Sequence, residues 1–187
     1  TLNFQVGNIS SLPLKNDLPP EIPSIISQLI DDTKSDWDAY ETSWDFTTLP
    51  LLSRDNASGS LSAIYSALRA DWRSMTDEMQ QLEEENNRIF IDAYGLQDEL
   101  TPEVPRHEIT LTCNPAYRYG PKTAPEDAEE RLLADTMKEF VSYAVGCMFG
   151  RYALEKPGLV LANASETLED YLRQVPEPSF AADDDNV

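Results

Sequence analysis

The sequence predicts a mainly α fold, a helical domain with two long helices and a small β element. Apolar residues recur at helical spacing in three stretches, whereas only two short stretches alternate as strands do. With 187 residues, 41% of them hydrophobic, the chain is long enough for one domain with its own core. We therefore expect a single helical unit.

The first helix is predicted to follow Pro19 and Pro20. Its apolar residues have the i, i+3, i+4, i+7, i+8 spacing of one buried face, and they are Ile22, Ile25, Ile26, Leu29 and Ile30.

The longest helix is predicted to begin after Ser60, a good N-cap, and to end at Gly95, which favours the C′ position. Between them the apolar residues keep helical spacing, and they are Leu61, Ile64, Tyr65, Leu68, Trp72, Met75, Met79, Leu82, Ile89, Phe90 and Ala93. Such a helix is roughly 50 Å long, which suits a spine or connector. Coiled-coil dimerisation is the alternative, but the intervals are irregular and Glu83 to Glu85 form a like-charged run.

The small β element is predicted at residues 107–113 (HEITLTC), where Asn114 and Pro115 would end the strand. Residues 2–14 also alternate, and they include Gly7 and Pro13, which predicts a short strand and turn without sheet partners.

A second long helix is predicted after Pro125. Its inward residues are expected to be Leu132, Leu133, Met137, Phe140, Val141, Ala144, Val145, Met148 and Phe149. Gly146 and Gly150 form a G-x-x-x-G, and their missing side chains would let another helix approach closely. A short helix at 167–172 and an acidic tail follow.

Charge argues against autonomous DNA binding. The chain has 34 acidic and 14 basic residues, a net charge of -20, and such a surface repels phosphates unless basic residues cluster. The nearest approaches to a cluster are Arg69 with Arg73 and the scattered Arg118 and Lys122. The charge equally suits an acidic protein-interaction module.

No metal site, membrane span or thiol chemistry is predicted. Cys113 and Cys147 lack CxxC spacing, and the single His107 completes no familiar zinc pattern with them, so buried free thiols are expected. No stretch of about 18 uninterrupted apolar residues is present, which predicts a soluble cytoplasmic protein without membrane contact.

Residues 36–46 (DWDAYETSWDF) mix aromatic with acidic side chains. A carboxylate pair for acid/base chemistry or a sugar-stacking platform is one interpretation. An amphipathic staple that covers a core with its acids in water is the simpler one, because nothing fixes one acid against another.

One tetrapeptide has a catalytic interpretation, Asn114-Pro115-Ala116-Tyr117 after the predicted strand. Adenine-specific methyltransferases place an Asn/Asp-Pro-Pro-Tyr/Phe loop at a strand end, where it binds and stacks on an extruded base. Here Ala116 replaces the second proline, and no Gly-rich turn is present to hold S-adenosylmethionine. Because Asn-Pro commonly starts turns, we expect a structural turn and no catalytic, cofactor-binding or metal residue.

Four runs resemble a known family in their order along the chain. They are DWDAYETSWDF at 36–46, LEEENNRIFIDAYGLQDELTPEV at 82–104, the run from EERLLADTMKEF to LVLANA at 129–164, and ETLEDYLRQVP at 166–176. These runs are similar to stretches in large single-chain adenine-specific DNA methyltransferases of type IIG restriction and BREX phage-exclusion systems. The last two are most similar to the PglX-like BREX enzymes.

The resemblance implies an excised internal segment of such an enzyme. Residues 1–14 would be the tail of the upstream methyltransferase domain, 15–176 a helical spacer, and 177–187 an acidic flexible tail. The cofactor S-adenosylmethionine and the catalytic motif would lie upstream, and target recognition mostly downstream. The segment alone would be inactive, contacting those flanking domains and meeting DNA only through the parent protein. The alternative is a module that docks other defence-system proteins.

Overall fold

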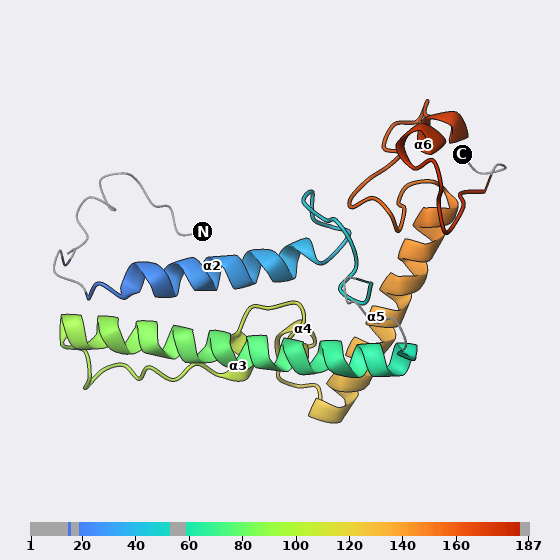
Figure 1. The fold of residues 1–187 in the computed structure, drawn as a ribbon. Helices are drawn as coiled ribbons and strands as arrows, with labels where there is room; N and C mark the ends of the chain where they lie inside the picture. Colours follow the sequence, from blue (N-terminus) through green and yellow to red (C-terminus); the bar gives the residue numbers. More distant parts are fainter. Residues whose placement is uncertain (1–14, 16–18, 53–58, 184–187) are drawn as a thin grey trace.

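The computed structural model describes residues 15, 19–52 and 59–183, and this part of the chain is mainly helical (Figure 1). Its elements in order are α2 (Ile22–Asp38), α3 (Leu61–Tyr94), the 3-10 turn η1 (Arg106–Glu108), α4 (Pro115–Arg118), α5 (Pro125–Met148) and α6 (Leu168–Gln174). The predicted mainly α class and both long helices are confirmed.

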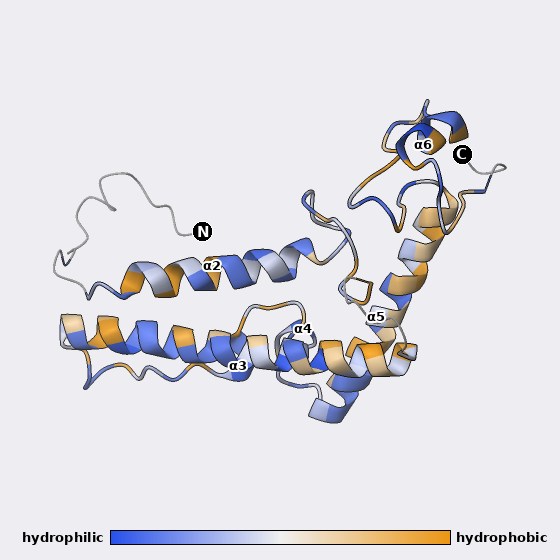
Figure 2. Cartoon of the chain, in the orientation of Figure 1, coloured by the Kyte–Doolittle hydropathy of each residue, from blue (hydrophilic) through white to orange (hydrophobic). Residues whose placement is uncertain are grey.

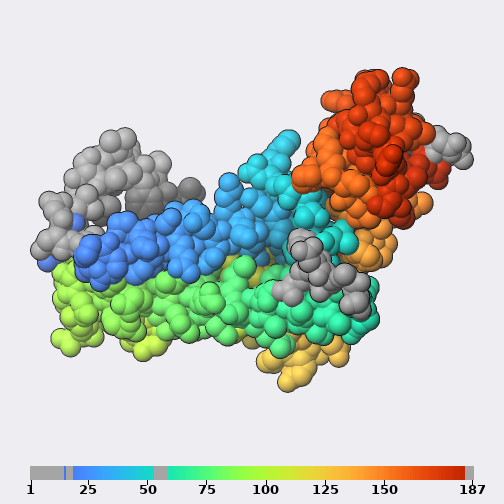
Figure 3. All heavy atoms as spheres, in the orientation of Figure 1, coloured from blue at the N-terminus to red at the C-terminus, as the bar shows by residue number. Residues whose placement is uncertain are grey.

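Helix α3 is the spine of the molecule. Helix α2 runs antiparallel along it, and α5 crosses its amino-terminal half at a steep angle (Figure 1). After α3 the chain returns beneath the same helix through residues 96–118, so α3 has neighbours on several sides. Residues 150–183 form a separate lobe around α6 at the far end of α5 (Figure 3).

Both ends of α3 follow local signals that the sequence displays. The Ser60 hydroxyl accepts a hydrogen bond from the Ala63 N–H at 3.3 Å, which satisfies a donor of the first turn. Gly95 has φ of 68°, a left-handed conformation that a Cβ would disfavour, and it ends the helix. The predicted limits of α3 are therefore confirmed.

The core is divided into clusters. The largest lies where α3 faces the 104–113 segment and α5, and its members are Leu51, Leu68, Trp72, Met79, Val104, Ile109, Leu111, Cys113 and Leu132. A second joins Phe46 and Leu49 to Tyr143, Cys147 and Tyr152 of the α5 end. A third fills the lobe around Tyr171, and a fourth joins Ile22 and Ile25 of α2 to Ile89 of α3.

The predicted strand at 107–113 is wrong. These residues form η1 and turns, and the described residues contain no strand, only an isolated bridge between Ala153 and Lys156. The alternation is nevertheless real, because Ile109, Leu111 and Cys113 are fully buried while the side chains between them are not. Their backbone groups bond to turns and to the Asp36 carboxylate instead of a sheet partner. The alternating stretch 2–14 lies outside the described residues.

Two predicted buried faces are only partly buried. In α2, Ile22 and Ile25 pack on α3, but Ile26 and Ile30 point to the outer side, with 40% and 59% of their surface exposed. In α5 the inner positions are Leu132, Thr136, Tyr143, Gly146 and Cys147. The expected inward residues that prove to be exposed are Leu133, Val141, Val145, Met148 and Phe149. Both helices have apolar residues outside their buried faces. Figure 2 colours the apolar positions along each helix.

The G-x-x-x-G does not admit another helix on the glycine face. A Cβ on Gly146 would lie 2.7 Å from the Tyr152 ring, so the space is already filled by this chain's own aromatic. Gly150 has φ of 70° and lies beyond the end of α5, where the Arg151 N–H bonds back to the Gly146 carbonyl at 2.8 Å. Gly146 leaves space for the Tyr152 ring, and Gly150 adopts the left-handed conformation at which the chain turns.

Candidate functional site

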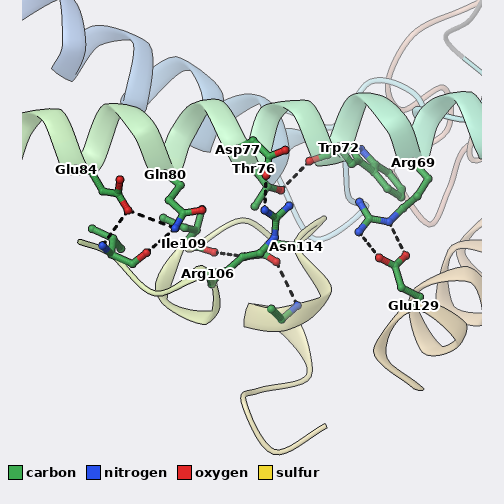
Figure 4. Close-up of polar contacts among 12 residues, drawn as sticks. Arg69, Trp72, Thr76, Asp77, Gln80, Glu84, Arg106, Ile109, Asn114 and Glu129 are labelled. Carbon is green, nitrogen blue, oxygen red and sulfur yellow. Dashed lines mark hydrogen bonds and ion pairs between the residues drawn. The ribbon is translucent and has the colours of Figure 1, made fainter. Parts of the chain in front are cut away.

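The Asn114-Pro115-Ala116-Tyr117 tetrapeptide folds as the capped start of α4. The Asn114 amide donates to the carbonyls of Arg106 at 2.7 Å and Ile109 at 2.9 Å, and its oxygen accepts from the Ala116 N–H at 3.2 Å (Figure 4). The side chain is 1% exposed. Every polar group of Asn114 thus has an internal partner, and none faces a position that a base could occupy. Tyr117 lies exposed beside it.

Asp36, near the end of α2, joins that helix to the same segment. Its buried carboxylate accepts the Thr112 N–H at 2.5 Å and the Cys113 N–H at 2.9 Å. Charge-assisted hydrogen bonds of this kind are stronger than neutral ones. No local pattern predicts this role of Asp36, because its partners are 76 and 77 residues away.

Both cysteines are free and buried, as predicted. Burial, with the nearby Asp36 charge, raises the pKa of the Cys113 thiol far above its usual range. Burial likewise raises the pKa of Cys147, to about 11. The raised pKa values favour the protonated thiols at neutral pH, which disfavours a nucleophilic role for either cysteine.

His107 is partly exposed in η1, with Glu108 3.9 Å away. In residues 19–52 and 59–183, no three His, Cys, Asp or Glu side chains are grouped so that they could hold a metal ion. Within the same ranges no helix is both long and apolar enough to cross a membrane.

The basic residues that came nearest to a cluster are neutralised by acids. Arg69 makes a bidentate contact with Glu129 of α5, with both N–O distances 2.7 Å (Figure 4). Arg73 approaches the same carboxylate at 3.2 Å. Arg106 pairs with Asp77. Lys122 is exposed in the turn before α5. A phosphate therefore meets no concentrated positive charge at these positions.

Arg118 is the centre of a second polar group, between α2, α4 and α5. Its guanidinium donates to Glu139 at 3.0 Å, lies 3.8 Å from Asp135, and covers the Tyr40 ring at 5.6 Å from the ring centre. Burial raises the pKa of Glu139, an effect that Arg118 opposes. Burial, with the neighbouring Asp36 charge, also raises the pKa of Tyr40.

A pocket of about 330 Å3 adjoins this group. Its wall comes from the α2 end and the following turn, from Thr112 and Arg118, and from α5. Apolar walls with a few converging polar groups are typical of a binding site. Sequence reasoning missed this pocket because its residues come from three separate segments, 37–49, 112–118 and 139–142. It treated Arg118 only as a scattered charge.

The 36–46 stretch both covers a core and exposes a platform. Phe46 is buried edge-on against Tyr143 and Tyr152, at ring distances of 6.1 and 5.6 Å. In contrast, Trp44 is fully exposed and Trp37 is 56% exposed at the pocket.

Comparison with known proteins shows which class the chain comes from. No family model matches it. It is 32% identical over 94% of its length to the adenine-specific methyltransferase PglX of Lacticaseibacillus casei, and 29% identical over its whole length to the adenine-specific methyltransferase BrxX of Escherichia coli. The chain spans only 14% and 15% of those two proteins.

The chain is therefore a segment of the kind found in adenine-specific methyltransferases. Within that class it is PglX-like, so the family resemblance deduced from the sequence is confirmed.

Proposed function

We propose that the chain is the helical connector of a site-specific adenine-N6 DNA methyltransferase in a BREX or type IIG phage-defence system. In this role it fixes the geometry between the methyl-transferring and sequence-reading parts of a longer polypeptide. The observation that carries the proposal is the match of nearly the whole chain to a small fraction of PglX and BrxX.

The fold supports a connector. Helix α3 has 34 residues and so extends over roughly 50 Å, longer than packing in a small domain requires. Helix α2 stiffens one part of this rod and α5 crosses another (Figure 1). Such a frame holds flanking parts at a set distance.

The surface supports it too. Val141, Val145, Met148 and Phe149 form an exposed apolar stripe on α5, and Ile26, Ile30 and Trp37 form another on α2. Exposed apolar patches mark contacts with other protein surfaces. Two such apolar patches on separate helices suit a segment that packs between two neighbouring parts of a longer polypeptide.

The chemistry would then belong to other parts of the polypeptide. Asn114 is fully committed to backbone groups, and the sequence has no Gly-rich turn to cradle S-adenosylmethionine. In the proposed parent, cofactor and catalytic motif lie upstream, and DNA is met by the parent in the cytoplasm rather than by this acidic segment.

Calorimetry with S-adenosylmethionine tests this division. We expect binding to a polypeptide extended to include the catalytic domain and no binding to the 187-residue chain; binding to the short chain would overturn the proposal. In the long form, Leu68→Asp should abolish site-specific methylation while cofactor affinity stays within about twofold, whereas the exposed Leu61→Asp should leave both unchanged. Loss of both properties together would assign the segment to the catalytic domain.

The second candidate function is an acidic module that docks other defence-system proteins. It is favoured by the internal pairing of Arg69, Arg73, Arg106 and Arg118, which leaves a large surplus of acids on the surface. Complex formation by the 187-residue chain with another purified defence protein, weakening steeply with salt, supports this role. Absence of such a complex at moderate salt removes it.

A further inference from the structure

The outer face of α2 has the pattern of a helix-binding seam. Ile26, Ile30, Thr33 and Trp37 follow one another at intervals of four, three and four residues, which places them on one side of the helix. The side chains of Ile26, Ile30 and Trp37 are 40%, 59% and 56% exposed, and with Leu29 and Lys34 they line a shallow, almost wholly apolar groove. The opposite face of α2 packs on α3 through Ile22 and Ile25.

This groove adjoins the pocket beside Arg118, because Trp37 lines both. The lining of the pocket extends past the end of α2 to Tyr40 and Glu41, and it includes Leu49 and Glu139. An apolar seam that ends in a pocket with a few converging polar groups matches a helix in a groove with one anchoring side chain.

The polar groups of the pocket indicate the anchor. Glu41 Oε2 lies 3.4 Å from the Tyr152 hydroxyl, but Glu41 Oε1 is buried without a hydrogen-bond partner in the described part of the chain. Glu41 and Glu139 together outweigh the single charge of Arg118, and the Trp37 ring adds a face that attracts cations. A Lys or Arg entering here would satisfy Glu41 and balance the charge. Arg118 Nη1, which has no hydrogen-bond partner among the described residues either, would meet the free carbonyls at the end of the incoming helix.

We propose that this seam and pocket receive a helix from another part of the same longer polypeptide, one with an apolar stripe and a basic residue at its end. The inference rests on the connector function proposed above. Two observations select the occupant: the matched proteins have roughly 85% of their length outside the matched segment, and a net charge of -20 opposes a second copy while favouring a basic partner surface.

Hydroxyl-radical footprinting of the tryptophans tests the docking directly. The oxidation rate of Trp37 is compared between the 187-residue chain and the long methyltransferase polypeptide, with the fully exposed Trp44 as internal control. We expect Trp37 to react about fivefold or more slowly in the long polypeptide, because a docked helix excludes solvent from the seam, while Trp44 keeps its rate.

Matched variants in the long polypeptide identify the contacts. Ile30→Asp should return Trp37 to within about twofold of its rate in the short chain, because the charge cannot enter an apolar seam. Glu41→Gln should raise the Trp37 rate by a smaller factor, because the amide keeps the size but loses the charge of the anchor. Val141→Asp, on the exposed stripe of α5, should leave Trp37 protected.

Three results would overturn the proposal. Equal Trp37 rates in the two polypeptides mean that no part of the long chain covers the seam, and a protection that vanishes on tenfold dilution assigns the seam to a second copy. Protection that survives Ile30→Asp places the cover elsewhere. The connector function has a separate readout, since cofactor affinity and methylation do not depend on Trp37 reactivity; either inference can therefore fail alone.

Discussion

The contact between α3 and the 104–118 segment contrasts with the outer faces of α2 and α5. In the former, several buried polar side chains find partners within the chain: Asn114 and Asp36 bind backbone groups, and Gln80 of α3 donates to the Val104 carbonyl at 2.7 Å. On the outer faces, large apolar side chains such as Ile30 and Val141 are about 60% exposed.

This contrast between paired polar groups and exposed apolar side chains indicates which contacts are formed within the chain and which surfaces lack a partner. A buried polar group left without a partner costs about 1 to 3 kcal/mol, so the full pairing of the Asn114 side chain marks a contact that is formed within the chain. Apolar surface left in water marks interfaces that need another surface. Substitutions at the two kinds of region should therefore differ in their effect on the isolated chain.

The largest effect is expected for Leu68→Asp in the main core cluster. Leu68 is 5% exposed, and a carboxylate there has no partner, so we expect a loss of about 4 kcal/mol or more, or no cooperative unfolding at all. Ile30→Asp on the outer face of α2 should change stability by less than about 0.5 kcal/mol. Urea unfolding followed by circular dichroism measures both. Equal losses would erase the distinction between the two regions.

Asn114→Ala comes next. It removes three hydrogen bonds and leaves the Arg106 and Ile109 carbonyls and the Ala116 N–H without that partner, for which we expect a loss of about 2 to 4 kcal/mol. Tyr117→Ala, at the exposed end of the same tetrapeptide, should cost less than about 1 kcal/mol. Thermal unfolding of the two variants measures the difference between these losses. An Asn114→Ala protein as stable as wild type would contradict the structural role assigned to Asn114.

Gly146→Ala should destabilise the second core cluster by about 1 to 3 kcal/mol, because the new Cβ would lie 2.7 Å from a ring carbon of Tyr152. The matched control is Gly59→Ala, whose Cβ would meet Ile64 at an ordinary 3.6 Å and should be neutral or slightly stabilising. Calorimetric melting of both proteins is the measurement. A neutral Gly146→Ala variant would show that Tyr152 has room to shift.

The smallest effect concerns Glu129, whose pKa is held below its ordinary value of 4.5 by hydrogen bonding to Arg69. A lowered folded pKa stabilises the protein above pH 4.5, and this contribution disappears as pH falls through the folded value. Because the carboxylate is 35% exposed, Glu129→Gln should cost only about 1 kcal/mol at pH 7. The difference from wild type should shrink below pH 4.5. A stability difference between wild type and Glu129→Gln that stays constant down to pH 2 would show that the charge of Glu129 is not its origin.

Helices were predictable where one local pattern decides them. Ser60, Gly95 and the apolar spacing between them define α3, and no distant contact overrides these signals. The 107–113 segment was mispredicted because its alternation reports burial on one side, which a strand and a turn-rich segment share. Here the Thr112 N–H bonds to the Asp36 carboxylate and not to a neighbouring strand, and no local sequence rule connects these two residues.

The candidate site shows the same limit. That Asn114 would start a turn was readable from Asn-Pro, but its two carbonyl partners depend on how η1 folds back. The exposed half of α5 was invisible to periodicity, since Val141 and Val145 are as apolar as buried residues. The pocket near Arg118 needs three elements that come together only in the folded chain.

The carboxylate of Asp36 also has a consequence for synthesis on the ribosome. Its partners Thr112 and Cys113 are 76 and 77 residues later in the chain. At a translation rate of about 5 to 20 residues per second, α2 waits roughly 4 to 15 s before the groups that anchor it have been made. During that interval the helix lacks its hydrogen bonds to the later loop, and until Ile89 of α3 has been made its isoleucines also lack their core partner and are open to chaperones.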